Sequence, residues 1–126
     1  FNGFQISNNI KRAEISKMNA ELQYQQELDN YAQTIERSHA DASSAWKQYL
    51  AAKKTLKAAK KAFEDASVRR QEGTLTVYDY SNVQNTYLVA ASDVASAKYD
   101  AHFKAFILEF YMKTPLIKAK NIDENE

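Results

Sequence analysis

The stretch Leu28–Ala66, LDNYAQTIERSHADASSAWKQYLAAKKTLKAAKKAFEDA, decides the fold. It contains neither Gly nor Pro, and apolar or small side chains recur along it in alternating steps of three and four residues. These positions are Leu28, Tyr31, Ile35, Ser38, Ala42, Ala45, Tyr49, Ala52, Leu56, Ala59, Phe63 and Ala66. A seam of this heptad period predicts a coiled-coil helix. Every second position of this seam is mostly Ala, so we expect a partner helix to pack closely and antiparallel against the seam.

The first helix is expected to extend well beyond this stretch. No Gly or Pro lies between Gly3 and Gly73, and we predict one helix over residues 7–72. Gly73 suits the left-handed residue that commonly ends a helix, and residues 73–76 are predicted to form the turn. Thr76 can cap the next helix, with Asp79 three residues later in the position of a capping-box acid.

A second, shorter helix is predicted over residues 77–112. Its seam is Tyr80, Val83, Tyr87, Ala90, Val94, Ala97, Ala101, Leu108 and Tyr111. A second stripe, which faces elsewhere, consists of Tyr99, Phe103, Phe106 and Phe110. Pro115 disfavours a helical conformation at the residue before it, so we expect the helix to stop there and residues 113–126 to be disordered. The predicted fold class is therefore all-α, a long antiparallel helical hairpin.

The two predicted helices differ in length. At 1.5 Å per residue the first is roughly 100 Å long and the second roughly 54 Å. The segment from Ile6 to Ile35 is then expected to have no partner within this chain, although several apolar side chains lie along it. Because an isolated helix has little stability in water, we expect it to need another chain or a missing part of its own protein. The chain begins at Phe1, and we expect it to be a piece of a longer protein.

Composition excludes several classes of protein. Two Gly and one Pro are too few for the turns of a sandwich, a barrel or a many-stranded α/β fold. Seventeen basic against sixteen acidic residues argue against general binding to nucleic acid. The chain has no Cys, which excludes disulfides and thiolate metal sites. The sequence contains no window of about 18 apolar residues, so it predicts no transmembrane helix.

Candidate chemistry is sparse. Glu36 and His39 have the Glu-x-x-His spacing of di-iron bundles, but no second motif accompanies them, so we interpret both as solvated. The basic run Lys47, Lys53, Lys54, Lys57, Lys60 and Lys61 is interpreted as a solvated helix face rather than a nucleic-acid stripe. No nucleophile–base pair and no phosphate-binding Gly loop can be assembled. We therefore expect no enzyme, no cofactor and no metal site.

The turn and the second helix carry a resemblance to a known family. The stretch VRRQEGTLTVYDYSNVQ, residues 68–84, resembles the periplasmic tip of TolC-family outer-membrane efflux proteins. YLVAASDVASAKYD, residues 87–100, is similar to that family's leucine-then-alanine helix, and ILEFY with Pro115 is similar to the end of its repeat. FNGF at the start resembles the close of the last β-barrel strand. The resemblance covers nearly the whole chain.

The resemblance implies a function by assembly. Such proteins are homotrimeric tubes, with a β-barrel in the outer membrane and an α-helical barrel across the periplasm. This chain would be the periplasmic helical part of one repeat: residues 1–6 leave a barrel strand, residues 7–72 descend, residues 73–76 are the tip, and residues 77–112 return. The tube is a passive duct that receives small molecules from an inner-membrane transporter through a periplasmic adaptor.

Site residues follow from the resemblance one at a time. Glu72, Gly73 and Thr74 match the tip that faces the adaptor. Arg70 and Asp79 match positions of the gate and entrance, whereas Leu75 and Asn82 stand where a basic and a second acidic residue can occur. Both departures weaken the case for a strongly electronegative entrance. For Asp79 a capping role, and for Arg70 a purely structural one, remain alternatives.

Two other functions stay open. The chain could be a stand-alone coiled-coil interaction module, or, ranked last, a carboxylate-metal bundle. In either the tube or the module, we expect the isolated chain to be soluble, helical and self-associating, with a four-helix dimer burying the unpartnered part of the first helix.

Overall fold

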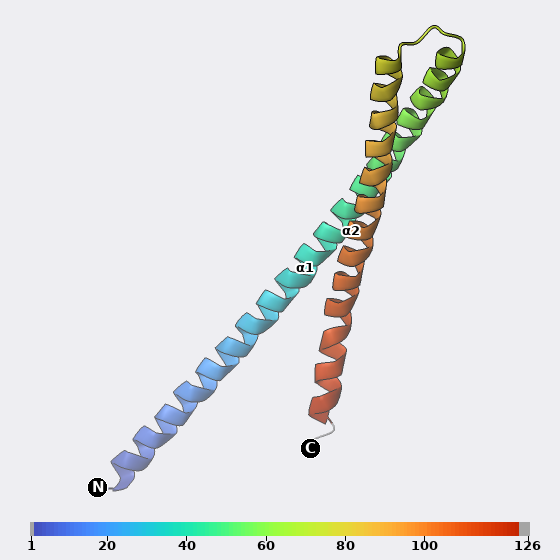
Figure 1. The fold of residues 1–126 in the computed structure, drawn as a ribbon. Coiled ribbons are helices and arrows are strands. Elements are labelled where there is room, and N and C mark those ends of the chain that lie inside the picture. Colours follow the sequence, from blue (N-terminus) through green and yellow to red (C-terminus); the bar gives the residue numbers. More distant parts are fainter. Residues whose placement is uncertain (1, 124–126) are drawn as a thin grey trace. The chain divides into compact units, whose positions relative to one another are not determined.

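The computed structural model describes residues 2–123, with the side chains of residues 3–113. Nearly all of the described residues are helical, and the two helices pack against each other. Helix α1 is Asn2–Gln71 and helix α2 is Val77–Asp123 (Figure 1). Within residues 2–123 the structure contains no strand. The predicted all-α fold with two packed helices is confirmed.

The chain divides into two compact units, residues 1–37 and residues 38–126. The first unit is a segment of α1, and its side chains from Gly3 to Asn30 are all exposed. Leu28, which the heptad pattern assigns to the seam, is 44% exposed. Leu28 lies in the segment from Ile6 to Ile35, and its exposure agrees with the expectation that this segment has no partner within the chain.

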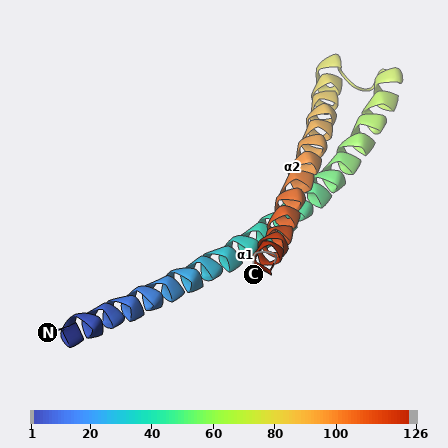
Figure 2. The same ribbon diagram turned by 90° about the horizontal axis from the view of Figure 1, so that it is seen from below.

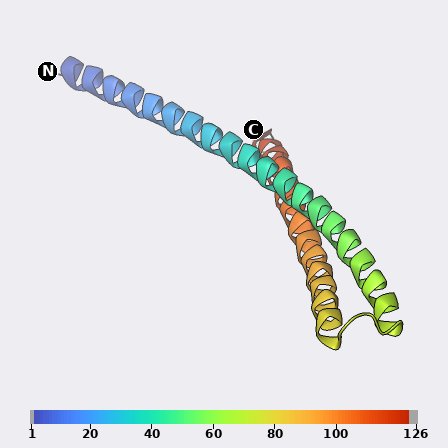
Figure 3. The ribbon, with the colours of Figure 1, turned by 90° about the horizontal axis from the view of Figure 1, so that it is seen from above.

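The second unit is an antiparallel hairpin, in which α2 lies beside residues 38–71 of α1 (Figures 2 and 3). Every predicted seam residue of this unit is buried or half-buried. Among the side chains of residues 38–113, those that are buried are all alanines, namely Ala45, Ala59, Ala66, Ala90 and Ala101. Small side chains let two helix backbones approach closely while larger neighbours fill the remaining space. The expected close packing at the alanine positions is confirmed.

The helix boundaries differ from those expected. Helix α1 begins at Asn2, so residues 2–6, which were expected to leave a β-strand, belong to the helix. The single Gly3 does not prevent this, because a helix tolerates a glycine at a cost of about 1 kcal/mol. Phe1 lies outside the described residues.

Helix α2 continues through Pro115 to Asp123, which corrects the expected end at residue 112 and the expected disorder of residues 113–123. Proline removes one backbone hydrogen bond and disfavours, without forbidding, a helical residue before it. The sequence LIKAK that follows consists of residues compatible with a helix, so the helix resumes its hydrogen bonding. Residues 124–126 of the expected tail lie outside the described part of the chain.

Candidate functional site

The end of α1 is closed by a glycine motif. Gly73 has a φ of 74°, in the left-handed region that L-residues with a side chain rarely adopt. Its N–H donates to the Arg70 carbonyl at 3.2 Å, and the Thr74 N–H donates to the Arg69 carbonyl at 2.9 Å. These two bonds form a Schellman motif. The Thr74 hydroxyl adds a 3.1 Å bond to the same Arg69 carbonyl, so the chain leaves α1 in a defined direction.

The start of α2 is capped by Thr76 and Asp79. The Asp79 N–H donates to the Thr76 hydroxyl oxygen at 3.1 Å, and that hydroxyl donates to Asp79 Oδ2 at 2.6 Å. The Tyr80 N–H donates to the Thr76 carbonyl at 3.1 Å, which begins the helix. Thr76 is therefore the N-cap residue predicted from the sequence. The Asp79 carboxylate accepts from the hydroxyl of this cap, a variant of the capping-box role predicted for it. A role of Asp79 in an entrance or gate stays a prediction.

An aromatic cluster fixes the two helices to each other just behind this turn. The Phe63 ring on α1 stacks on the Tyr87 ring of α2, with centroids 5.2 Å apart and planes 4° from parallel. The Tyr80 ring lies 5.7 Å from the same Phe63 ring, tilted by 36°. Such aromatic pairs stabilise by about 0.5–1.5 kcal/mol each beyond their buried area. The conformation of the turn is thus fixed by the cap at the end of α1, by the cap at the start of α2, and by the aromatic contacts between the two helices.

The residues predicted to dock an adaptor lie together in the exposed turn between the two helices. Glu72, Gly73 and Thr74 are all exposed at the turn. A Cβ added at Gly73 would meet no atom within 4 Å, so nothing in the chain covers the glycine. The backbone here is hydrogen-bonded at both ends of the turn and open to solvent at Gly73.

The predicted gate residues flank the same turn. Arg70, Asp79 and Asn82 are exposed, whereas Leu75 is half-buried. Arg70 lies in the last turn of α1 and Asp79 in the first turn of α2, where each charge is stabilised by the helix dipole. The dipole gives both residues a structural role that needs no second subunit. Leu75 is the least accessible of these residues.

Two exposed apolar side chains beside the turn were not singled out from the sequence. Val77 is 61% exposed and Tyr78 is 75% exposed. Their exposure could have been predicted from the sequence, because neither residue falls on the α2 seam that begins at Tyr80. Together with Glu72, Gly73 and Thr74 they form what we call the tip surface. Its chemistry is mixed: one carboxylate, open backbone, one aromatic ring and one aliphatic side chain.

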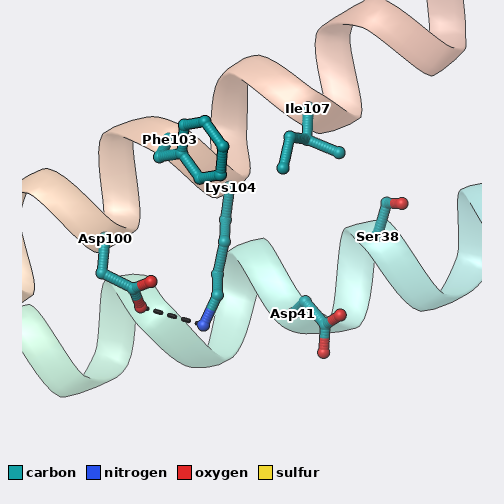
Figure 4. Close-up of a pocket in the computed structure, with 6 residues that line it drawn as sticks. All are labelled: Ser38, Asp41, Asp100, Phe103, Lys104 and Ile107. Carbon is teal, nitrogen blue, oxygen red and sulfur yellow. Dashed lines mark ion pairs between the residues drawn. The ribbon is translucent and has the colours of Figure 1, made fainter.

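A shallow hollow lies between the helices far from the turn (Figure 4). Its volume is about 220 Å³, and it is lined by Ser38, Asp41, Asp100, Phe103, Lys104 and Ile107. Lys104 extends from α2 toward α1, and its Nζ pairs with Asp100 Oδ2 at 2.9 Å (Figure 4). Lys104 occupies a heptad position of the α2 seam between Ala101 and Leu108, where the sequence pattern was interrupted. The hollow is smaller than a typical ligand pocket and already contains its own ion pair.

The lysine face on α1 is exposed as predicted. Lys47, Lys53, Lys54, Lys57, Lys60 and Lys61 are all solvent-exposed. Lys60 pairs with Glu64 at 3.8 Å, and the Lys53 Nζ lies 5.5 Å from the centre of the Tyr49 ring. An open hollow of about 330 Å³ lies over this face, lined by Leu50 and three of the lysines. Exposed ion pairs of this kind add little stability, so the face mainly keeps the helix solvated.

The remaining sequence candidates do not assemble into a site. Glu36, His39 and His102 are each exposed. Among the described residues no group of three or more His, Cys, Asp or Glu side chains could hold a metal ion. In the same part of the chain, neither helix has a stretch long and apolar enough to cross a membrane.

Comparisons with protein families, with curated proteins and with solved structures gave no match to this chain. The sequence patterns and the geometry of the hairpin therefore carry the functional argument.

Proposed function

We propose that this chain is a wall element of the periplasmic α-helical tunnel of a trimeric outer-membrane efflux channel of the TolC type. In this proposal the tunnel is a passive duct. The tip surface docks a periplasmic adaptor, which connects the duct to an inner-membrane transporter. The chain has no catalytic role, and its trimeric context comes from the rest of a longer protein.

The observation that carries the proposal is the exposed apolar surface of residues 3–37. The side chains concerned are between 54% and 83% exposed: Phe4, Ile6, Ile10, Ile15, Met18, Leu22 and Tyr24. A stand-alone protein rarely leaves so many large apolar side chains of one helix segment in water, and extended apolar surface of this kind marks interaction sites. Neighbouring helices of a tunnel wall would cover them.

The tip supports the same function. A hairpin end that docks a partner must keep its shape without that partner, and here two caps and the Phe63 cluster fix it. Glu72, Gly73 and Thr74 are then presented in the open, next to Val77 and Tyr78. In the sequence, Glu72, Gly73 and Thr74 stand where the resembled family has its adaptor-facing turn, and their exposure supports the proposal.

The test is a hairpin exchange. Residues 38–112 would replace the equivalent hairpin of a TolC-family channel, in a strain that lacks its own channel. We expect trimers in the outer membrane and restored drug resistance. A matched variant with Glu72→Ala and Thr74→Ala should still form trimers but lose resistance. Trimers without resistance in the unmodified exchange would contradict the docking role of the tip, and absence of trimers would contradict the wall role.

One observation favours the alternative of a stand-alone coiled-coil interaction module. The seam of residues 38–113 closes within the chain, so this hairpin needs no tube to fold. The two functions differ in the parent gene product. The tunnel requires a second hairpin of the same pattern, with strand-like segments between the two, whereas the module requires neither.

A further inference from the structure

Helix α1 separates its charges along its length. Residues 18–36 contain four acidic residues and no basic residue, whereas residues 42–63 contain six lysines and no acidic residue. All of these charged side chains are exposed. Two helices with such blocks attract each other when they lie antiparallel, with the acidic block of one beside the basic block of the other. They repel each other when they lie parallel and in register.

One row of exposed side chains runs along the basic block. Lys47, Leu50, Lys54, Lys57 and Lys61 follow one another in alternating steps of three and four residues, and all five are exposed. In the heptad frame of the α1 seam this row lies about 150° around the helix from the seam, on nearly the opposite face. We call its heptad positions the outer row of α1. Helix α2 packs on the seam, so the outer row can contact another molecule as well as keep α1 solvated.

The outer row continues through the acidic block. Counting back from Lys57 in steps of seven residues reaches Glu36, Asp29 and Leu22 in this block, and then Ile15. These four side chains are exposed, Leu22 at 62% and Ile15 at 55%. The outer row therefore carries carboxylates and apolar side chains in its first half and lysines in its second half.

Four charged side chains of the outer row have no ion-pair partner within the described part of their own chain, namely Asp29, Glu36, Lys47 and Lys54. The two acids are seven residues apart, and so are the two lysines. Antiparallel helices of the same heptad period keep facing positions level over successive repeats, so this equal spacing lets both acids meet both lysines in one register. The partner that fits the basic block is therefore an acidic helix with this spacing, and α1 itself contains one.

We propose that residues 15–36 of α1 bind residues 47–68 of α1 in a second copy of this chain, antiparallel and through the outer row, with each copy contributing both segments. Such an interface uses the same surface on both copies and closes at a dimer. The inference goes beyond the proposed tunnel and does not rest on it. The four facing pairs are Glu36 with Lys47, Asp29 with Lys54, Leu22 with Lys61, and Ile15 with Val68 of the second copy.

The other contacts are compatible with this register. Ile15 and Val68 are both apolar and are 55% and 53% exposed, so their contact removes apolar surface from water. Leu22 lies against the aliphatic stem of Lys61, whose ammonium group stays in solvent. Like charges do not meet in the remaining layers, because each residue there faces an uncharged side chain. These layers pair Leu50 with Gln33, Lys57 with Gln26, and Glu64 with Asn19.

The extent of the interface also fits a dimer. Each segment spans about three heptads, roughly 33 Å of helix. About four positions of each heptad contact an antiparallel partner, so the two segments contribute about 25 residues per copy. A standard interface has about 20–30 residues on each side. Because exposed ion pairs contribute only about 0.2–1 kcal/mol each, the charges mainly set orientation and register, and burial of apolar side chains and stems supplies much of the affinity.

The first test measures the mass of the chain by sedimentation. The full chain should be a dimer that dissociates more readily as the salt concentration rises, because salt screens exposed charges. The variant Lys47→Glu with Lys54→Glu and the variant Asp29→Lys with Glu36→Lys should each be monomeric, with unchanged helicity by circular dichroism. An equimolar mixture of these two variants should form dimers, since every reversed charge then faces an opposite one.

The matched control is Lys98→Glu with Lys113→Glu. It changes the net charge as much as the lysine variant does, at two exposed positions of α2. This control should remain a dimer. A monomeric parent chain, a larger assembly, charge-reversed variants that dimerise alone, a mixture that stays monomeric, or a monomeric control would overturn the proposal.

The second test measures register with a short thiol cross-linker. The chain has no Cys, so Leu22→Cys and Lys61→Cys each introduce a unique thiol. The axes of packed helices are about 8–10 Å apart, so thiols at facing positions lie within reach of each other. Cross-linked dimers should form in a mixture of the two Cys variants and in neither variant alone. Cross-linking within a single variant would show a parallel dimer, and its absence from the mixture would show a different register; either result contradicts the proposal.

Discussion

A pair of adjacent alanines offers the sharpest check of the helix packing. Ala59 is 9% exposed on the seam, whereas Ala58 is exposed. Ala59→Glu places extra volume between the helices, which lowers the free energy of unfolding by about 1–3 kcal/mol. It also removes a carboxylate partly from water, which lowers the free energy of unfolding by a further few kcal/mol, on the order of the cost of a buried charge. Because the long Glu side chain can bend toward solvent, we expect a total loss of about 3–5 kcal/mol. That is a large part of the 5–15 kcal/mol by which typical domains are stable.

Ala58→Glu introduces the same residue and the same charge one position away. Its carboxylate lies three and four residues from Lys61 and Lys54, so it should stabilise the helix by about 0.2–0.5 kcal/mol per pair. Urea unfolding followed by circular dichroism, at several protein concentrations, gives both free energies of unfolding. The packing deduced here would be refuted if the two variants unfolded within about 0.5 kcal/mol of each other.

Three further substitutions probe the tip. Gly73→Ala should lower the free energy of unfolding by about 1–2 kcal/mol, because a Cβ strains the left-handed φ of 74°, and an unchanged urea midpoint would contradict this. Thr76→Ala should cost about 1 kcal/mol through loss of the N-cap, with amide exchange of Asp79 rising as the local readout. A double-mutant cycle with Phe63→Leu and Tyr87→Leu should give a coupling of about 0.5–1.5 kcal/mol, and zero coupling would mean that the rings do not stack in solution.

The seam of the hairpin could be predicted from the sequence because it depends on a period. Alternating steps of three and four residues identified the buried faces of both helices, from Ser38 to Ala66 and from Tyr80 to Tyr111. The turn was predictable for a different reason: only a glycine adopts the conformation at residue 73 readily, and Thr76 with Asp79 has capping chemistry. Period and local backbone chemistry are properties that a short stretch of sequence carries by itself.

The sequence predictions that were wrong also have specific physical causes. Lys104 was left out of the seam because a lysine conflicts with an apolar pattern, yet its long stem is apolar and its ammonium group reaches Asp100. The end of α2 was placed before Pro115 because local sterics were given more weight than the helix-forming residues that follow.

One question about the fold is why α2 turns its alanine face, rather than its more apolar phenylalanine face, toward α1. Both faces have the heptad period, so period alone does not choose between them. Side-chain volume differs between the two faces: α1 presents the buried Ala45, Ala59 and Ala66 at the contact, and α2 presents Ala90 and Ala101. Phenylalanines in place of the α2 alanines would hold the two helices farther apart. The side-chain volumes at the contact therefore favour the alanine-bearing face of α2, and Tyr99, Phe103, Phe106 and Phe110 remain exposed on another face of the same helix.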